Sequence, residues 1–132
     1  MPGTSTAGRG GSELERRVIA LGRSLGLEAT GQVRVGRRIW GAERFIDVVL
    51  TNPPDRRRLG LECKFQGTAG SAEEKIPTTI QDIAAWPIHG IVVFDGEGFS
   101  ANIRSYLTAS GKAVAFEDLE SWLRLFFGLP LP

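Results

Sequence analysis

Two apolar segments, residues 44–50 (RFIDVVL) and 61–65 (LECKF), carry the charged residues that decide the fold and the candidate site. Asp47 lies in the middle of the first segment, and Glu62 and Lys64 occupy alternate positions in the second. Alternate side chains of a β-strand point to the same face, so Glu62 and Lys64 are expected to point together. Charged groups within apolar strands are unfavourable unless they are paired or bind a metal ion. The pattern therefore predicts a functional site on a β-sheet.

The turn between these segments predicts how they face each other. Asn52-Pro53-Pro54-Asp55 is a strong turn signal between predicted strands at residues 44–51 and 58–66. A hairpin centred on the middle of this turn places Asp47 opposite Glu62, with Cβ atoms about 5 Å apart. Two carboxylates at that separation repel each other unless a cation lies between them.

The composition limits the kinds of site that the chain can build. With 132 residues, 42% of them hydrophobic and 23% charged, it has the size and balance of one globular domain. One Cys and one His exclude an internal disulfide, a Cys-based metal cage and a His-rich zinc site. Any metal ion must then be held by oxygen ligands, which indicates Mg²⁺ or Mn²⁺.

Charge and hydropathy give weaker indications of partner and compartment. The net charge is +1, but arginines cluster at Arg16-Arg17, Arg37-Arg38 and Arg56-Arg57-Arg58. Such clusters either bind phosphates or remain solvated. No apolar run approaches the roughly 18–20 residues of a membrane span, and the N-terminal residues lack the apolar core of a signal peptide. These features predict a cytoplasmic protein.

Periodicity and turn signals predict alternating helices and strands around the hairpin. A flexible leader is expected at residues 1–11, followed by a helix with Ser12 as N-cap, Glu15 in its first turn and Gly26 beyond its end. Residues 12–127 are predicted to form one domain and residues 128–132 a tail. The remaining predictions are strands at 32–40, 89–95 and 112–116, helices from 77 to before 87, at 99–109 and at 117–127, and a mobile loop at 66–74.

The predicted fold class is therefore mixed α/β. An antiparallel meander followed by crossover units gives a mixed sheet with helices on both sides, which is a three-layer sandwich. Within the helices, the predicted inward residues include Ile80, Ile83 and Ala84 in the second helix, and Ile103, Tyr106 and Leu107 in the third.

This order of elements and charges resembles the PD-(D/E)XK nuclease superfamily, which has the restriction-endonuclease-like fold with a core of order α-β-β-β-α-β. The resemblance covers residues 12–95, with Ile46-Asp47 as the first half-motif and Glu62-Cys63-Lys64 as the second. Ile46 stands in the place of the proline that gives the family its name. Some subgroups carry a Gln followed four positions later by Tyr, whereas Gln81 here is followed by Ala85.

The resemblance implies roles for these residues. Asp47 and Glu62 would bind Mg²⁺ or Mn²⁺ together with the backbone carbonyl of Cys63. Lys64 would orient or activate the attacking water and stabilise charge on the transition-state oxygens.

Other residues are assigned supporting roles. Glu15 is a possible ligand of a second metal ion, and Glu13 is the alternative candidate for the same role. Gln66 and Gln81 would place a water molecule or a phosphate. The candidate nucleic-acid contacts are Arg37, Arg38 and Lys75.

The expected function is a Mg²⁺-dependent nuclease acting on DNA, or on RNA, in repair, recombination or mobile-element processing, as a homodimer or with a partner protein. One alternative is a catalytically silent domain of the same fold that binds nucleic acid or protein, with Asp47, Glu62 and Lys64 as an ion-paired cluster. Another is a dinucleotide-binding turn, since Gly96-Glu-Gly-Phe-Ser-Ala101 fits G-x-G-x-x-A. Only 36 residues follow Gly96, however, and a tight strand-to-helix turn explains the same pattern.

Overall fold

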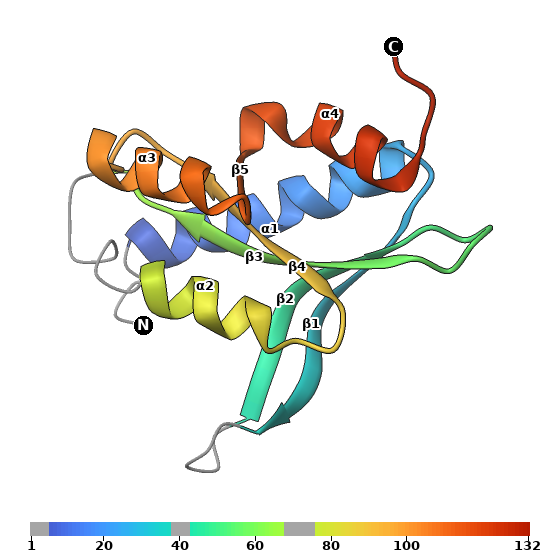
Figure 1. Cartoon of the computed structure of the whole chain (residues 1–132), viewed down its shortest axis with the longest axis horizontal. Coiled ribbons are helices and arrows are strands. Elements are labelled where there is room, and N and C mark those ends of the chain that lie inside the picture. Colours follow the sequence, from blue (N-terminus) through green and yellow to red (C-terminus); the bar gives the residue numbers. More distant parts are fainter. Residues whose placement is uncertain (1–5, 38–42, 68–75) are drawn as a thin grey trace.

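A computed structural model describes residues 6–37, 43–67 and 76–132, with the backbone alone described for residues 6–10 and 37 (Figure 1). Within these ranges the chain alternates helices and strands in the predicted order. The elements are α1 (Thr6–Ser24), β1 (Glu28–Arg37), β2 (Glu43–Thr51), β3 (Arg58–Phe65), α2 (Ile76–Ala84), β4 (His89–Asp95), α3 (Ala101–Ser110), β5 (Ala113–Ala115) and α4 (Phe116–Phe127).

One mixed sheet organises the molecule, with the strand order β1-β2-β3-β4-β5. β1, β2 and β3 form an antiparallel meander, while β4 pairs with β3 and β5 with β4 in parallel. Helices α2 and α3 supply the two parallel crossovers. The mixed α/β fold class is therefore confirmed.

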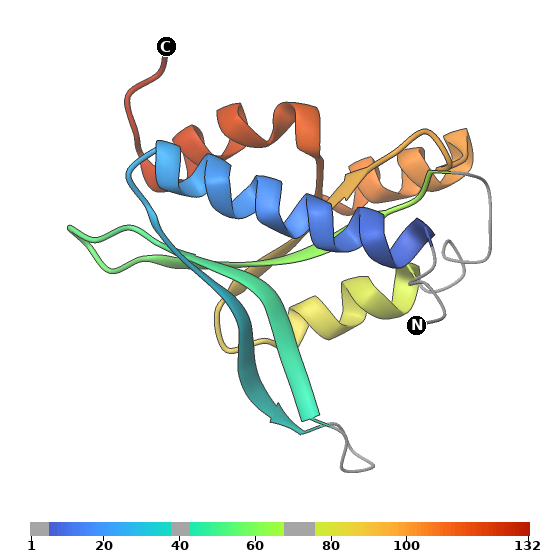
Figure 2. The ribbon, with the colours of Figure 1, turned by 180° about the vertical axis from the view of Figure 1, so that it is seen from behind.

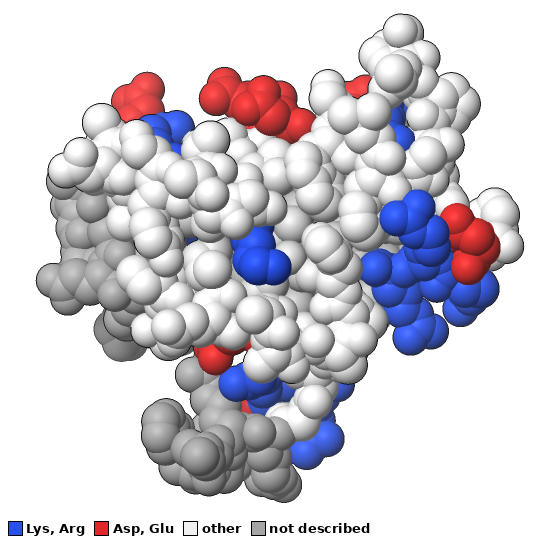
Figure 3. All heavy atoms as spheres, in the orientation of Figure 1, with Lys and Arg blue, Asp and Glu red and all other residues white. Residues whose placement is uncertain are grey.

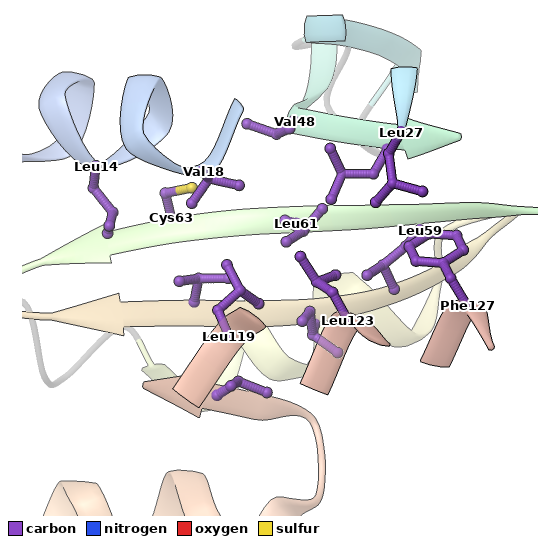
Figure 4. Close-up of a cluster of buried hydrophobic side chains, with 14 residues drawn as sticks. Leu14, Val18, Leu27, Val48, Leu59, Leu61, Cys63, Leu119, Leu123 and Phe127 are labelled. Atoms are coloured by element: carbon purple, nitrogen blue, oxygen red, sulfur yellow. The ribbon is translucent and has the colours of Figure 1, made fainter. Parts of the chain in front are cut away.

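Helices cover both faces of the sheet, which gives the predicted three layers. α1 and α4 lie side by side over one face (Figure 2), where Leu14 and Val18 of α1 and Leu119 and Leu123 of α4 pack into one apolar cluster with β3 (Figure 4). α2 and α3 pack against the opposite face through two smaller clusters. Each fully buried leucine contributes roughly 1.5–3 kcal/mol. No described helix is long and apolar enough to cross a membrane.

Two glycines allow α2 to approach this opposite face. Trp86, just after α2, is buried over Gly60 of β3 and Gly90 of β4. A Cβ on Gly60 would lie 2.8 Å from the indole ring, and one on Gly90 would lie 2.7 Å from Cγ2 of Ile83. The glycines thus let the end of α2 pack directly on the sheet.

The structure differs from the predictions in a few places. α1 begins at Thr6, so Ser12 lies inside the helix and residues 6–11 form its first turns rather than a leader. The residues from 6 to 12 contain no proline, so nothing interrupts the helical hydrogen bonds there. Tyr106, predicted to face inward, is 43% exposed, and Ala84 is also exposed. Leu107 and Ile103, one turn apart, hold α3 to the sheet, and Tyr106 is turned away from that contact.

A bend in the β1–β2 ribbon determines where the charged residues lie. In a regular strand, residues three apart point to opposite faces. Here Thr30 and Val33 of β1 line the same cavity, and so do Ile46 and Val49 of β2. The alternation is therefore broken in both strands near Asp47. Figures 1 and 2 show the ribbon curving away from the sheet at its free end.

Candidate active site

Asp47 lies where β2 separates from β3. The two strands pair from Thr51↔Arg58 to Val48↔Leu61, which is the register that the sequence predicted. The β2–β3 pairing does not continue beyond Val48 and Leu61. Instead, the backbone N–H of Cys63 donates to Oδ2 of Asp47 at 2.9 Å. The turn chemistry of the hairpin thus places the Asp47 carboxylate beside the Glu62–Lys64 segment.

Glu62 and Lys64 share a face of β3, as the strand period requires. Nζ of Lys64 lies 3.6 Å from Oε2 of Glu62, and these side chains are 33% and 23% exposed respectively. Both charges are therefore reachable from solvent but are largely surrounded by protein.

The carboxylates of Glu15, Asp47 and Glu62 lie close enough for their charges to affect the pKa of Glu62. Burial, with smaller contributions from the charges of Asp47 and Glu15, raises the pKa of Glu62 to about 7 against the opposing effect of Lys64. The same burial and the same carboxylates raise the pKa of the Cys63 thiol. A neutral buried thiol is a small apolar group, which agrees with the predicted packing role of Cys63.

Glu15, rather than Glu13, reaches this cluster. Burial and the charge of Asp47 raise the pKa of Glu15, while a hydrogen bond from Gln32 lowers it. Glu13 is exposed and pairs with Arg16 at 3.4 Å on the outer surface of α1. α1 thus supplies one carboxylate to the end of the sheet, as the sequence allowed.

Gln32 is a site residue that the sequence did not reveal. Its Nε2 lies 3.0 Å from Oε1 of Glu15 and 3.3 Å from Oδ1 of Asp47. Its φ of +52° places it in the left-handed region, which costs an ordinary L-residue roughly 1–2 kcal/mol. Nothing in the sequence marks this conformation, because Gln is not a residue typical of positive φ.

The structure places the other predicted residues differently. Gln66 is buried, and its Nε2 donates to the carbonyl of Gly98 at 2.9 Å, so this amide holds the turn that follows β4. Gln81 is exposed on α2. Arg38, Lys75 and the side chain of Arg37 lie outside the described part of the chain.

The glycine-rich turn after β4 has a structural explanation. The N–H of Gly98 donates to the carbonyl of Gln66 at 2.7 Å, and Oγ of Ser100 caps α3 by accepting from the N–H of Ile103 at 3.2 Å. Gly96 has φ +105° and lies against the Gln66 backbone, where a Cβ would collide. The adjacent cavity, of about 210 Å³, is lined by Asp95, Glu97 and Glu117 with Arg104. Three carboxylates around it disfavour a pyrophosphate.

The donor set at the end of β2 and β3 fits a hard divalent cation. Asp47 and Glu62, with Glu15 and the Cys63 carbonyl, offer only oxygen ligands, which Mg²⁺ and Mn²⁺ prefer. No three acidic, His or Cys side chains within the described ranges already stand in a coordinating arrangement. Oδ2 of Asp47 accepts from the Cys63 N–H, while Glu62 is turned towards Lys64, so Glu62 would have to turn from Lys64 to join Asp47 around a cation.

Comparisons with known proteins agree with this geometry. The protein of unknown function AF1548, which has a solved crystal structure, shares the fold with a TM-score of 0.53 and 22% identity. The match covers 78% of this chain and 56% of that one, so the chain spans little more than half of that protein. No curated protein matches the sequence. The sequence model of the PD-(D/E)XK nuclease superfamily domain matches residues 7–124, and the chain therefore belongs to this superfamily.

Proposed function

We propose that this protein is a Mg²⁺-dependent nuclease that hydrolyses DNA phosphodiester bonds, with RNA as the second candidate substrate. The observation that carries the proposal is the cluster of Asp47, Glu62 and Lys64 at the point where β2 and β3 separate, inside a chain of the nuclease superfamily. Burial first, and then the charge of Asp47, raise the pKa of Glu62, and a cation bound beside the carboxylate would offset both effects.

Each residue of this cluster has a chemical role in the proposal. Asp47, Glu62 and the Cys63 carbonyl would hold the cation, and Glu15 would hold a second ion or its water. Mg²⁺ bound there would supply polarisation of the phosphate and a lowered pKa of its bound water. Lys64, a third exposed and next to Glu62, would orient the attacking water and donate to the phosphate oxygens as they gain charge.

The arginines of one molecular face support a nucleic-acid partner. A cavity of about 480 Å³ beside the bent β1–β2 ribbon is lined by apolar side chains together with Arg34, Arg56, Arg58 and one acidic residue, Glu28. Figure 3 shows basic side chains at the right and lower edges of this face and most acidic ones along its upper edge. Arginine guanidinium groups suit phosphates well. Arg37, Arg38 and Lys75 remain proposed additional contacts, and a homodimer or a partner protein would extend this surface.

A cleavage assay tests the proposal. Single-stranded, duplex, flapped and branched DNA, and an RNA of the same sequence, are incubated with Mg²⁺ or Mn²⁺. Wild type should cleave at least one substrate, and Lys64→Ala should lower its rate by at least about 100-fold, because removal of one charge-stabilising donor has effects of this size. Circular dichroism confirms that the variant remains folded.

Lys112→Ala is the matched control, since Lys112 precedes β5, which is the edge strand of the sheet and is separated from β3 by β4. It should cleave as wild type does. Equal loss in both lysine variants, or full activity in Lys64→Ala, would contradict the assigned role.

A silent binding domain is the second candidate function. The contacts of Asp47 with the Cys63 N–H and of Glu62 with Lys64 also suit a charge cluster that only closes the end of the sheet. Binding of DNA with no cleavage of any substrate in either metal ion would favour this alternative.

A further inference from the structure

Gln32 occupies a special position in the β1–β2 ribbon. The pairs Gly31↔Val48 and Val33↔Ile46 are part of the antiparallel ladder, and Gln32 and Asp47 lie opposite each other between them, outside it. This is the point at which the alternation of both strands breaks. Gln32 and Asp47 thus lie within the bent part of the ribbon, before the register shift between Arg34 and Gly36.

The Gln32 amide joins two elements that are distant in sequence. Its Nε2 contacts Glu15 of α1 at 3.0 Å and Asp47 of β2 at 3.3 Å. An amide nitrogen has two hydrogens, so it can donate one to each carboxylate. The positive φ of Gln32 coincides with these two contacts, in a conformation that non-glycine residues rarely adopt.

The chemical nature of the bridge matters. Lys or Arg at this position would place a positive charge between the carboxylates and would compete with a metal cation. A neutral amide holds both carboxylates near each other and leaves their charges available. Asp47 also accepts from the Cys63 N–H through its other oxygen, so both of its oxygens have defined partners.

We propose that Gln32 is a positioning residue, whose amide holds the carboxylates of Glu15 and Asp47 in place for binding a divalent cation. Outer residues of this kind orient metal ligands, and their loss usually lowers metal affinity about 10-fold or more. The inference rests on the proposed function only in that both require the cation site.

Two substitutions separate the amide from the backbone conformation. Gln32→Met keeps a side chain of similar length and the strained φ but removes the donor. Gln32→Gly removes the donor and also the strain. Arg56→Gly is the control for Mn²⁺ binding in the absence of nucleic acid, because Arg56 is the other described non-glycine residue with positive φ (+59°) and lies in the β2–β3 turn, outside the carboxylate cluster.

Mn²⁺ binding is measured by the electron paramagnetic resonance signal of the free ion, with Mg²⁺ as competitor, and thermal unfolding is recorded in EDTA. We expect both Gln32 variants to bind Mn²⁺ about 10-fold more weakly than wild type. Gln32→Gly should also unfold at the same or a higher temperature, because its backbone strain is gone. Arg56→Gly should bind Mn²⁺ as wild type does. If Gln32 served the fold alone, its substitution would lower stability and leave the Mn²⁺ affinity unchanged. A fall in Mn²⁺ affinity without a fall in stability therefore supports the positioning role.

The outcomes distinguish the inference from the proposed function. If wild type binds Mn²⁺ and Gln32→Met binds it equally well, the positioning role is wrong and the nuclease proposal stands. A fall in unfolding temperature in Gln32→Gly with unchanged affinity likewise assigns Gln32 to folding alone. If wild type binds no Mn²⁺, the metal-dependent function itself is overturned, and the inference with it.

Discussion

Glu62 shows how a single residue can be both unfavourable for folding and useful for chemistry. Its carboxylate is mostly buried and shares its surroundings with Asp47, and among the residues that the structure describes only Lys64, 3.6 Å away, compensates. Burial and like charge both favour the protonated form. Without a cation and at a pH between 4.5 and about 7, the folded protein therefore favours a protonated Glu62, whereas the unfolded chain would release this proton.

This raised pKa predicts the pH dependence of stability. The pKa of Glu62 rises from 4.5 to about 7 on folding, so between these values the native state binds more protons than the unfolded state. The free energy of unfolding should then fall as the pH rises through this window, by about 1–3 kcal/mol. Below the window the contribution no longer changes. Glu62→Gln should remove most of this slope and be more stable than wild type at pH 8.

Urea unfolding in EDTA at several pH values measures the effect. Glu120→Gln is the control, because Glu120 pairs with Arg124 at 3.0 Å on the surface of α4 and is half exposed. Its difference from wild type should stay within about 0.5 kcal/mol, as for other exposed pairs. A difference between Glu62→Gln and wild type that is the same at pH 5 and pH 8 would show that Glu62 does not titrate in this window.

At the scale of elements, the sheet accepts α2 only because two strands carry glycine under Trp86. Gly90→Ala would place a Cβ 2.7 Å from Cγ2 of Ile83 and against the indole of Trp86. The contact is with the body of buried side chains, so overpacking should lower the free energy of unfolding by about 1–3 kcal/mol. Thermal and urea unfolding measure this loss.

A glycine elsewhere in the sheet provides the comparison. A Cβ on Gly31 of β1 would meet its nearest neighbours, the Asp47 carbonyl and Cδ1 of Ile19, at 3.7 Å, which is ordinary van der Waals contact. Gly31→Ala should therefore leave stability unchanged or slightly raised. Equal destabilisation by the two substitutions would contradict the packing explanation for Gly90.

The elements differ in how well the sequence predicts them. β4 has the bounds predicted, and the β2–β3 hairpin has the predicted register, because an apolar run ended by a strong turn leaves one plausible pairing. The start of α1 was wrong, since the capping pattern at Ser12 competes with simple continuation of the helix. The inward face of α3 was also predicted wrongly at Tyr106, which is exposed, because this helix has few apolar residues to define a face.

The site was predictable only in part, for physical reasons. Asp47, Glu62 and Lys64 stood out because charges in apolar strands are rare, and the strand period brings Glu62 and Lys64 together. Gln32 did not stand out, because its role depends on a positive φ and on a bend shared by two strands. Gln66 is the opposite case, because the sequence pattern assigned it to the site. In the structure its amide donates to the Gly98 carbonyl and holds a turn.

At the scale of the whole molecule, charge is distributed unevenly over the face in Figure 3. The cavity beneath the bent ribbon begins at Ile46, next to Asp47, and extends to Arg56 in the β2–β3 turn and Arg58 at the start of β3. Arg56 pairs with Glu28 at 3.5 Å, and both side chains are about 60% exposed, so this pair is weak and can open to a phosphate. A nucleic-acid backbone lying along the ribbon would connect this cavity with the candidate active site.

This arrangement predicts a local effect of Arg58 on nucleic-acid binding. Arg58→Ala, made in a Lys64→Ala background to prevent cleavage, should bind a fluorescent DNA several-fold more weakly and reduce the slope of log affinity against log salt by about 1. Arg124→Ala is the matched control, since Arg124 pairs with Glu120 on α4, which covers the opposite face of the sheet. Fluorescence anisotropy at three or more salt concentrations measures both quantities. Equal weakening by the two substitutions would show that the DNA responds to overall charge rather than to this face, whereas a loss confined to Arg58 would place the DNA along the β1–β2 ribbon.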